Sequence, residues 1–168
     1  MGLFSFLKTA GAALAGVNAA KNKNTPPPNI PATDTNHAME ELEEAQMAMR
    51  ITNQIASLGL KVSKLSVEVD DDKATVFGTV ESQAEREKVI LAAGNVYGIA
   101  TVDDRLSVVT PEPQATFYTV QKGDSLSKIA KAHYGSYKDY MKIFEANRPL
   151  LSDPDKIYPG QVLRIPPA

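Results

Sequence analysis

YTVQKGDSLSKIA, at residues 118–130, and IYPGQVLRIP, at residues 157–166, decide the fold of the C-terminal part of this chain. Asp124 or Ser125 is placed to cap a helix, because a short polar side chain there accepts a hydrogen bond from the first helical turn. The inward apolar residues of that helix are Leu126, Ile129 and Ala130. A second helix, which ends before Pro149, has the inward residues Met141, Ile143, Phe144 and Ala146. A last strand contains Val162, Leu163 and Ile165. The pattern predicts a strand–helix–helix–strand (βααβ) unit over residues 116–168.

Four separated parts of this unit resemble a LysM domain: the Gly-Asp-Ser-Leu turn at 123–126, Tyr134-Gly135, IFEAN at 143–147 and PGQVLRIP at 159–166. The resemblance implies a shallow groove between two loops that holds glycans containing N-acetylglucosamine, such as peptidoglycan or its fragments. The residues of these loops are Gly123, Asp124, Ser125 and Leu126, and Ile157, Tyr158, Pro159 and Gly160. A purely structural interpretation stays open, because Gly and Pro also form tight turns and Asp also caps helices.

Residues 38–110 contain a second unit with a different order of elements. A helix is predicted from Ala38 to a stop at Gly59, followed by two strands whose apolar residues alternate: Leu65, Val67 and Val69, then Ala74, Val76, Gly78 and Val80. Ser82 and Glu85 form a capping box that opens another helix, and a last strand runs from Ile99 to Val109. This αββαβ order, with GIATVDDRL at 98–106, resembles a BON domain, a small α/β sandwich without catalytic chemistry. The expected fold is therefore α+β, with a BON domain followed by a LysM domain.

Acidic residues gather at two places in this unit. Glu40, Glu41, Glu43 and Glu44 suit the positive end of a helix dipole, which predicts a solvated helix start. Asp70, Asp71 and Asp72 lack the alternating ligands, central glycine and distal glutamate of a calcium loop, so a hairpin turn is the better interpretation.

The remaining segments are an N-terminal stretch and two linkers. Residues 1–20 are expected to form a short helical segment that packs on the BON domain, and residues 21–37, with four prolines, a linker. Residues 111–115 form a second, shorter linker. We expect no export signal, because Lys8 follows the first apolar cluster and the next stretch is rich in Ala and Gly rather than Leu. No apolar run approaches the roughly 18–20 residues that cross a bilayer.

Composition excludes several classes of protein. The chain has no cysteine, so it can form neither a disulfide nor a thiolate metal site. Its net charge of −2 divides into +2 for residues 1–37, −6 for 38–109 and +2 for 110–168, which favours docking of the two domains on each other. No dense basic patch with interleaved aromatics supports nucleic-acid binding. Neither His37 nor His133 has partners spaced for zinc, and no serine lies in a nucleophile elbow, so we expect no enzyme activity.

The whole chain resembles a family of bacterial potassium-binding proteins with one BON and one LysM domain. The resemblance rests on the start MGLF, on GN at 94–95, GIA at 98–100, VDD at 102–104, FEAN at 144–147 and PDKIYPGQVLRIP at 154–166. It implies a cytoplasmic, monomeric protein that binds one K⁺ and changes conformation, with the LysM domain docked on the BON domain. By position, it implies that the carbonyl donors to K⁺ are Leu7, Ala10, Ala12, Gly94, Val96 and Ile99.

Such a site leaves little trace in a sequence. Neutral carbonyl oxygens replace the water shell of K⁺, whereas clustered carboxylates favour Ca²⁺ or Mg²⁺. Unpaired carbonyls converge where helices end, and residues 94–99 follow a predicted helix. The residues alone also fit an N-terminal helix that merely packs and an ordinary helix-to-strand turn. Two other functions stay open: a periplasmic adaptor that binds peptidoglycan through LysM, and a cytoplasmic binder of cell-wall precursors.

Overall fold

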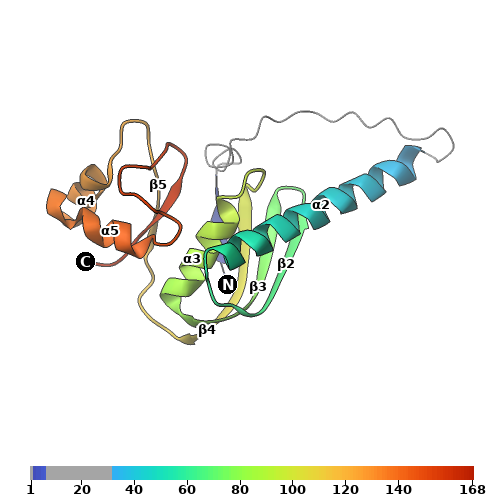
Figure 1. Cartoon of the computed structure of the whole chain (residues 1–168), viewed down its shortest axis with the longest axis horizontal. Helices are drawn as coiled ribbons and strands as arrows, with labels where there is room; N and C mark the ends of the chain where they lie inside the picture. The colour runs from blue at the N-terminus through green and yellow to red at the C-terminus, as the bar shows by residue number, and fades with distance from the viewer. Residues whose placement is uncertain (1, 7–31) are drawn as a thin grey trace.

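The computed structural model describes residues 2–6 and 32–168, which form two units that lie side by side (Figure 1). The first unit contains a four-stranded sheet with two helices, and the second contains a two-stranded sheet with two short helices. This arrangement confirms the predicted α+β fold. None of the described helices is both long enough and apolar enough to cross a lipid bilayer.

The first unit has the predicted αββαβ order. Helix α2 (Ala32–Ser57) is followed by the hairpin β2 (Ser63–Asp70) and β3 (Lys73–Ser82), then by α3 (Gln83–Gly94) and β4 (Thr101–Thr110). Strands β3 and β4 are parallel, with α3 as the crossover between them. The core forms where the helices cover the sheet, and its fully buried residues include Ile51, Ile55, Val76, Val89, Ile90, Leu91, Ile99 and Val102.

Local signals explain how these elements begin and end. Ser82 caps α3 by accepting a hydrogen bond from the Glu85 N–H at 3.2 Å, as the capping box predicts. Asp71 and Asp72 form the turn of the β2–β3 hairpin, and Asp71 has the left-handed φ of 55° that Asp tolerates in turns. The hairpin interpretation of the three aspartates is therefore confirmed.

The prediction of a helix at the N-terminus is wrong for its first residues. Gly2–Ser5 form strand β1, which pairs antiparallel with β4 and completes the sheet order β1-β4-β3-β2. Without β1, one side of β4 would present an unpaired row of backbone groups, and a short extended segment satisfies them. Phe4 adds an apolar side chain that packs against the core. The rest of the expected segment, residues 7–20, lies outside the described residues.

Helix α2 also begins earlier than predicted, at Ala32, inside the range 21–37 that was interpreted as a linker. After Pro31 the sequence contains no proline or glycine until Gly59, so nothing in it interrupts a helix. The side chains from Asn36 to Arg50 are exposed or half-buried, whereas Ile51 and Ile55 are fully buried. The first half of α2 therefore extends beyond the sheet (Figure 1).

The second unit has the predicted βααβ order. Strand β5 (Thr116–Thr119) pairs antiparallel with β6 (Val162–Ile165), and between them lie α4 (Leu126–Tyr134), the 3₁₀ helix η1 (Tyr137–Asp139) and α5 (Tyr140–Ala146). Ser125 caps α4 by accepting from the Lys128 N–H at 3.3 Å. The core of this unit consists of Val120, Leu126, Ile129, Ala130, Ile143, Phe144, Leu151, Leu163 and Ile165. Met141, which was expected to face inward, is exposed instead.

Candidate functional site

The loop Gly94–Ile99 joins the end of α3 to the region before β4. Asn95 N–H donates to the Leu91 carbonyl at 3.0 Å and Val96 N–H to the Ala93 carbonyl at 3.3 Å, which closes the last turn of the helix. Ile99 N–H then donates to the Val96 carbonyl at 3.2 Å. No hydrogen bond from the described residues reaches the carbonyl oxygens of Gly94 and Ile99, although both residues are buried. The loop therefore offers backbone oxygens that can still accept a ligand.

Phe6 packs directly on Gly94. A Cβ added to Gly94 would lie 2.2 Å from Phe6 Cζ, so only glycine fits below this ring. The backbone of Phe6 also donates a hydrogen bond to the Ala100 carbonyl at 2.7 Å. The chain therefore passes the loop just before Leu7, the first of the expected N-terminal donors. Leu7, Ala10 and Ala12 themselves lie outside the described residues.

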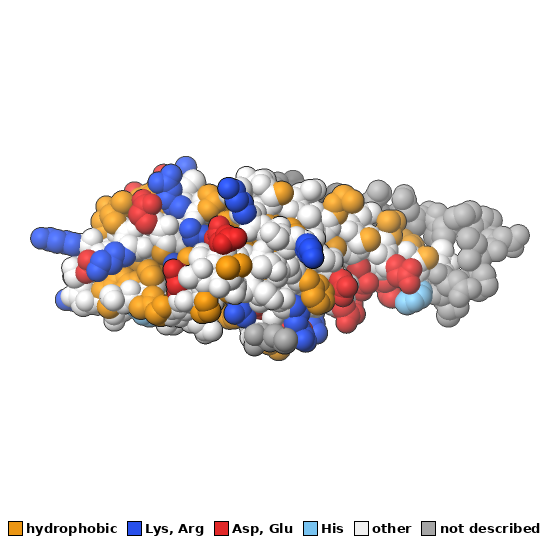
Figure 2. Space-filling model, turned by 90° about the horizontal axis from the view of Figure 1, so that it is seen from below, with side chains coloured by type: hydrophobic (Ala, Val, Ile, Leu, Met, Phe, Trp, Pro, Cys, Tyr) orange, Lys and Arg blue, Asp and Glu red, His pale blue; other side chains and the backbone are white. Residues whose placement is uncertain are grey.

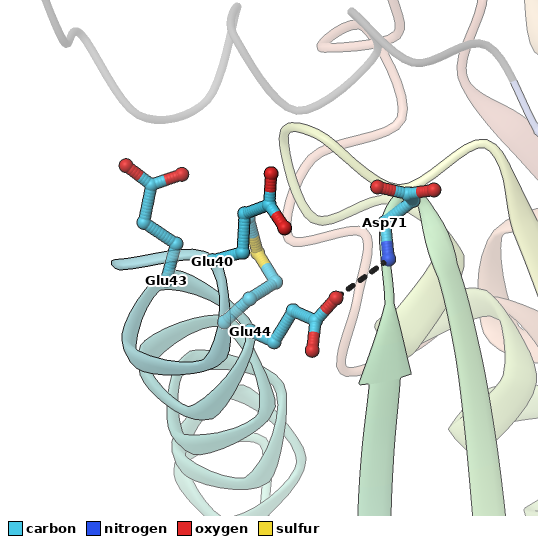
Figure 3. A pocket seen from close by; sticks show the side chains of 5 residues that line it. Glu40, Glu43, Glu44 and Asp71 are labelled. Atoms are coloured by element: carbon cyan, nitrogen blue, oxygen red, sulfur yellow. Dashed lines mark hydrogen bonds between the residues drawn. The ribbon is translucent and has the colours of Figure 1, made fainter. Parts of the chain in front are cut away.

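Acidic side chains surround a hollow of about 230 Å³ between α2 and the β2–β3 turn (Figure 3). Its lining consists of Glu40, Glu43, Glu44, Met47 and Asp71, and Glu44 Oε1 accepts a hydrogen bond from the Asp71 N–H at 3.2 Å. Within the described part of the chain, no group of three or more His, Asp or Glu side chains is placed to hold a metal ion. The hollow is thus lined by acidic side chains at the surface. The expectation that these glutamates mark a helix start is wrong, because α2 begins at Ala32 and Glu40 already lies about two turns inside it, beyond the reach of the helix dipole.

This acidic surface borders the loop. The Asp72 carbonyl, in the same turn, accepts hydrogen bonds from Ala100 N–H at 2.8 Å and Thr101 N–H at 3.1 Å. Met47 Cε lies 2.9 Å from where a Cβ on Gly98 would be. Figure 2 shows acidic side chains gathered beside a histidine on this face, and His37 lies 3.5 Å from Glu41. The carboxylates give the neighbourhood of the loop a negative potential that attracts cations.

A buried polar network joins the two domains. Glu87 of α3 is 3% exposed and accepts hydrogen bonds from Arg164 Nε of β6 and from the Ala115 N–H at 2.9 Å. The Arg164 backbone is held by Asn147, whose Oδ1 accepts from its N–H and whose Nδ2 donates to its carbonyl, both at 2.7 Å. The network therefore links α3, the segment between the domains, β6 and the end of α5.

Strand β6 contributes to both cores. Val162 packs in the core of the first unit, whereas Leu163 and Ile165 pack in that of the second. This division follows from the alternation of side chains along a strand. Phe4 of β1 also contacts Phe117 of β5, with ring centroids 5.0 Å apart. The expected docking of the two domains is thus present, and it includes the N-terminal strand.

The expected glycan loops consist largely of residues with structural contacts. Asp124 Oδ2 accepts hydrogen bonds from the Tyr118 hydroxyl at 2.7 Å and from the Gln121 N–H at 2.9 Å. The hydrogen bond between Tyr118 and Asp124 raises the pKa of Tyr118. Lys128 Nζ donates to the Gly123 carbonyl at 2.8 Å, and Gly160 N–H donates to the Val120 carbonyl at 2.8 Å.

The remaining loop residues divide into buried and accessible ones. Leu126 is buried, and Ile157 and Tyr158 are half-buried. Pro159 is exposed, and the space where Gly123 would carry a Cβ is open. Burial raises the pKa of Tyr158 to about 12, and its buried hydroxyl has no hydrogen-bond partner among the described residues.

Comparison with known proteins gives two domain matches and a relative that spans the whole chain. The BON domain model matches residues 43–110, and the LysM domain model matches residues 118–166. The Potassium binding protein Kbp of Escherichia coli O6:H1 is 40% identical over 167 residues, which cover 99% of each chain. The chain belongs to the Kbp family. An uncharacterized protein of Deinococcus radiodurans is 57% identical over 51 residues, which cover 30% of this chain and 19% of that protein.

Membership of the Kbp family confirms the resemblance that the sequence predicted. It also gives the loop a context, because Gly94, Val96 and Ile99 lie in the BON domain of a Kbp-family chain. The structure brings these three residues together at the end of α3, next to Phe6.

Sequence reasoning missed the residues that connect the two domains of this Kbp-family chain. Glu87 lies in no motif, and Asn95 and Arg164 lie in segments that carry the family resemblance without any role being predicted for their side chains; the partners of all three lie far away in the chain. One signal was available: Arg164 stands between Leu163 and Ile165 in a strand that is otherwise apolar. A charged side chain in such a strand is costly to bury unless it is paired or reaches solvent, and here its partner is Glu87.

Proposed function

We propose that this protein binds K⁺ in the cytoplasm through backbone carbonyl oxygens of the BON domain and the N-terminal segment. The observation that carries the proposal is the relative that is 40% identical over essentially the whole chain and is named a potassium binding protein. The donors we propose are Gly94, Val96 and Ile99 in the described loop and Leu7, Ala10 and Ala12 before it.

The chemistry of the loop supports this ligand. Within residues 2–6 and 32–168, no hydrogen bond reaches the carbonyls of Gly94 and Ile99, and one backbone hydrogen bond reaches the Val96 carbonyl. Neutral oxygens suit a large, singly charged ion, because they replace its loosely held water at low cost. The acidic surface of Glu40, Glu43 and Glu44 raises the local concentration of cations without supplying a rigid carboxylate cage.

The proposed conformational change follows from the origin of the donors. A site built from two separate segments binds the ion well only when both segments are in place, so K⁺ favours the conformation that unites them. Phe6 on Gly94 and the hydrogen bond from Phe6 to Ala100 bring the N-terminal chain to the loop.

Thermal unfolding in KCl and NaCl at equal ionic strength tests the proposal. A ligand that binds only the folded state raises the unfolding temperature with its concentration, so KCl should stabilise the protein more than NaCl. Choline chloride controls for ionic strength. Identical unfolding temperatures in all three salts would remove the proposed function.

Glycan binding by the LysM domain is a second candidate, supported by the match over residues 118–166. Its test is co-sedimentation with purified peptidoglycan, with Pro159→Arg as the blocking variant because Pro159 is exposed in the expected groove. Sedimentation of the natural protein but not of this variant, together with a periplasmic location in cell fractions, would favour an envelope adaptor. Absence of sedimentation would exclude it.

A further inference from the structure

Asn95, which lies between two proposed carbonyl donors, is hydrogen-bonded to the LysM domain. Its Nδ2 donates to the Val162 carbonyl and its Oδ1 accepts from the Val162 N–H, both at 3.5 Å. In a β-sheet, the N–H and the carbonyl of one residue bind the backbone of a neighbouring strand. Here the side-chain amide of Asn95 binds the N–H and the carbonyl of Val162 in the same way. Asn95, at the end of α3, is therefore in direct contact with β6, so a movement of β6 relative to α3 changes this contact.

The geometry of the peptide group makes this contact relevant to the ion. The Gly94 carbonyl and the Asn95 N–H belong to one planar peptide unit, so they turn together. The N–H of that unit is held by the Leu91 carbonyl at 3.0 Å, and the side chain of the same residue is held by Val162. The hydrogen bond to Leu91 therefore sets the direction of the Gly94 carbonyl, and the side-chain contacts with Val162 tie the same residue to β6.

A second contact keeps β6 in place along α3. Glu87, which binds Arg164, lies about two helical turns before Asn95, so the two contacts fall on the same side of α3. Val162 and Arg164 are likewise on the same side of β6, because side chains alternate along a strand. The buried ion pair anchors the strand, and Asn95 lies where the anchored strand meets the loop.

We propose that Asn95 is a positioning residue for the cation site, so that docking of β6 on α3 sets the affinity of the loop for K⁺. This inference rests on the proposed function. The distance of 3.5 Å is longer than the usual range of about 2.7–3.2 Å for N–H···O bonds. A shift of a few tenths of an ångström at the end of α3 therefore changes the strength of both bonds, which couples the loop to the LysM domain.

The test is isothermal titration of the full-length protein with KCl and with NaCl, for the natural sequence and for Asn95→Ala and Asn95→Leu. The Leu variant keeps a similar volume without either hydrogen bond, which separates lost packing from lost positioning. Both variants should bind K⁺ about tenfold more weakly and lose part of the preference over Na⁺. Asn53→Ala, at an exposed asparagine of α2, is the matched control and should bind as the natural protein does.

Binding and stability readouts separate positioning from a merely structural role. If Asn95 only stabilised the fold, both variants would unfold at a lower temperature in salt-free buffer and still bind K⁺ with unchanged affinity and selectivity. That result would overturn the inference and leave the proposed function intact. Equal binding of K⁺ and Na⁺ by the natural protein would overturn both.

Discussion

Glu87 and Arg164 form a buried ion pair between the two domains, although 77 positions separate them in the sequence. Their side chains are 4% and 10% exposed, so solvent screens the pair little. Glu87 also accepts hydrogen bonds from Gln83 and from the Ala115 backbone, each at 2.9 Å. The domains are thus joined by a fully partnered carboxylate rather than by an apolar surface alone.

Removing the charge of Glu87 should strongly destabilise the protein. In Glu87→Gln, the Arg164 guanidinium stays buried without a counter-charge, which costs about 3–5 kcal/mol of unfolding free energy. Urea unfolding measures the loss. Glu145→Gln is the matched control, because Glu145 is 57% exposed and lies 3.6 Å from Arg148, and such a pair contributes at most about 1 kcal/mol. Similar losses in the two variants would contradict the role assigned to the buried pair.

Gly94→Ala should disturb the contact between the N-terminal strand and the loop. The new Cβ would overlap the ring of Phe6, which directly follows β1, so Phe6 must move, at a cost of about 1–3 kcal/mol. A double-mutant cycle with Phe6→Leu checks this explanation, because the smaller side chain should recover part of the loss. If the two substitutions are simply additive, the ring is not the cause.

Tyr158 should make stability fall in alkaline solution. Burial raises the pKa of its hydroxyl from 10.0 to about 12 in the folded protein. The unfolded chain therefore releases this proton at a lower pH than the folded protein does. The part of the folding stability that is linked to this proton is fully present below about pH 10 and is lost as the pH rises from about 10 to about 12. Urea unfolding across this pH range should show a shallower fall for Tyr158→Phe than for the natural protein.

At neutral pH the same substitution should cost nothing, because the hydroxyl of Tyr158 is buried without a partner. Tyr134→Phe is the contrasting variant, since the Tyr134 hydroxyl donates to the Pro166 carbonyl at 2.7 Å and its loss should cost about 0.5–1.5 kcal/mol. If Tyr158→Phe destabilises as much as Tyr134→Phe does, the hydroxyl of Tyr158 has a partner.

The elements of both domains were predictable because their signals are local. Alternation in β2 and β3, the Ser82 cap and the Gly59 stop each act within a few residues. Strand β1 was not predictable, since four residues that include Leu3 and Phe4 become a strand only when β4 offers an edge.

The candidate site was less accessible to sequence reasoning. Carbonyl ligands belong to the main chain, which every residue type has, so the residue types of Gly94, Val96 and Ile99 do not identify them as ligands. The family resemblance pointed to these positions. The contacts of Asn95 and Glu87 require the domains to dock, and no local pattern encodes that arrangement.

The measurement that tests the central claim most directly is a backbone NMR titration of the full-length protein with KCl and NaCl at matched ionic strength. K⁺ binding at carbonyls predicts saturable shifts of the amides from Asn95 to Ala100 in KCl, with the same midpoint for the amides that follow Leu7, Ala10 and Ala12, and little response to NaCl. Equal, non-saturating shifts in both salts would contradict a selective site at this loop.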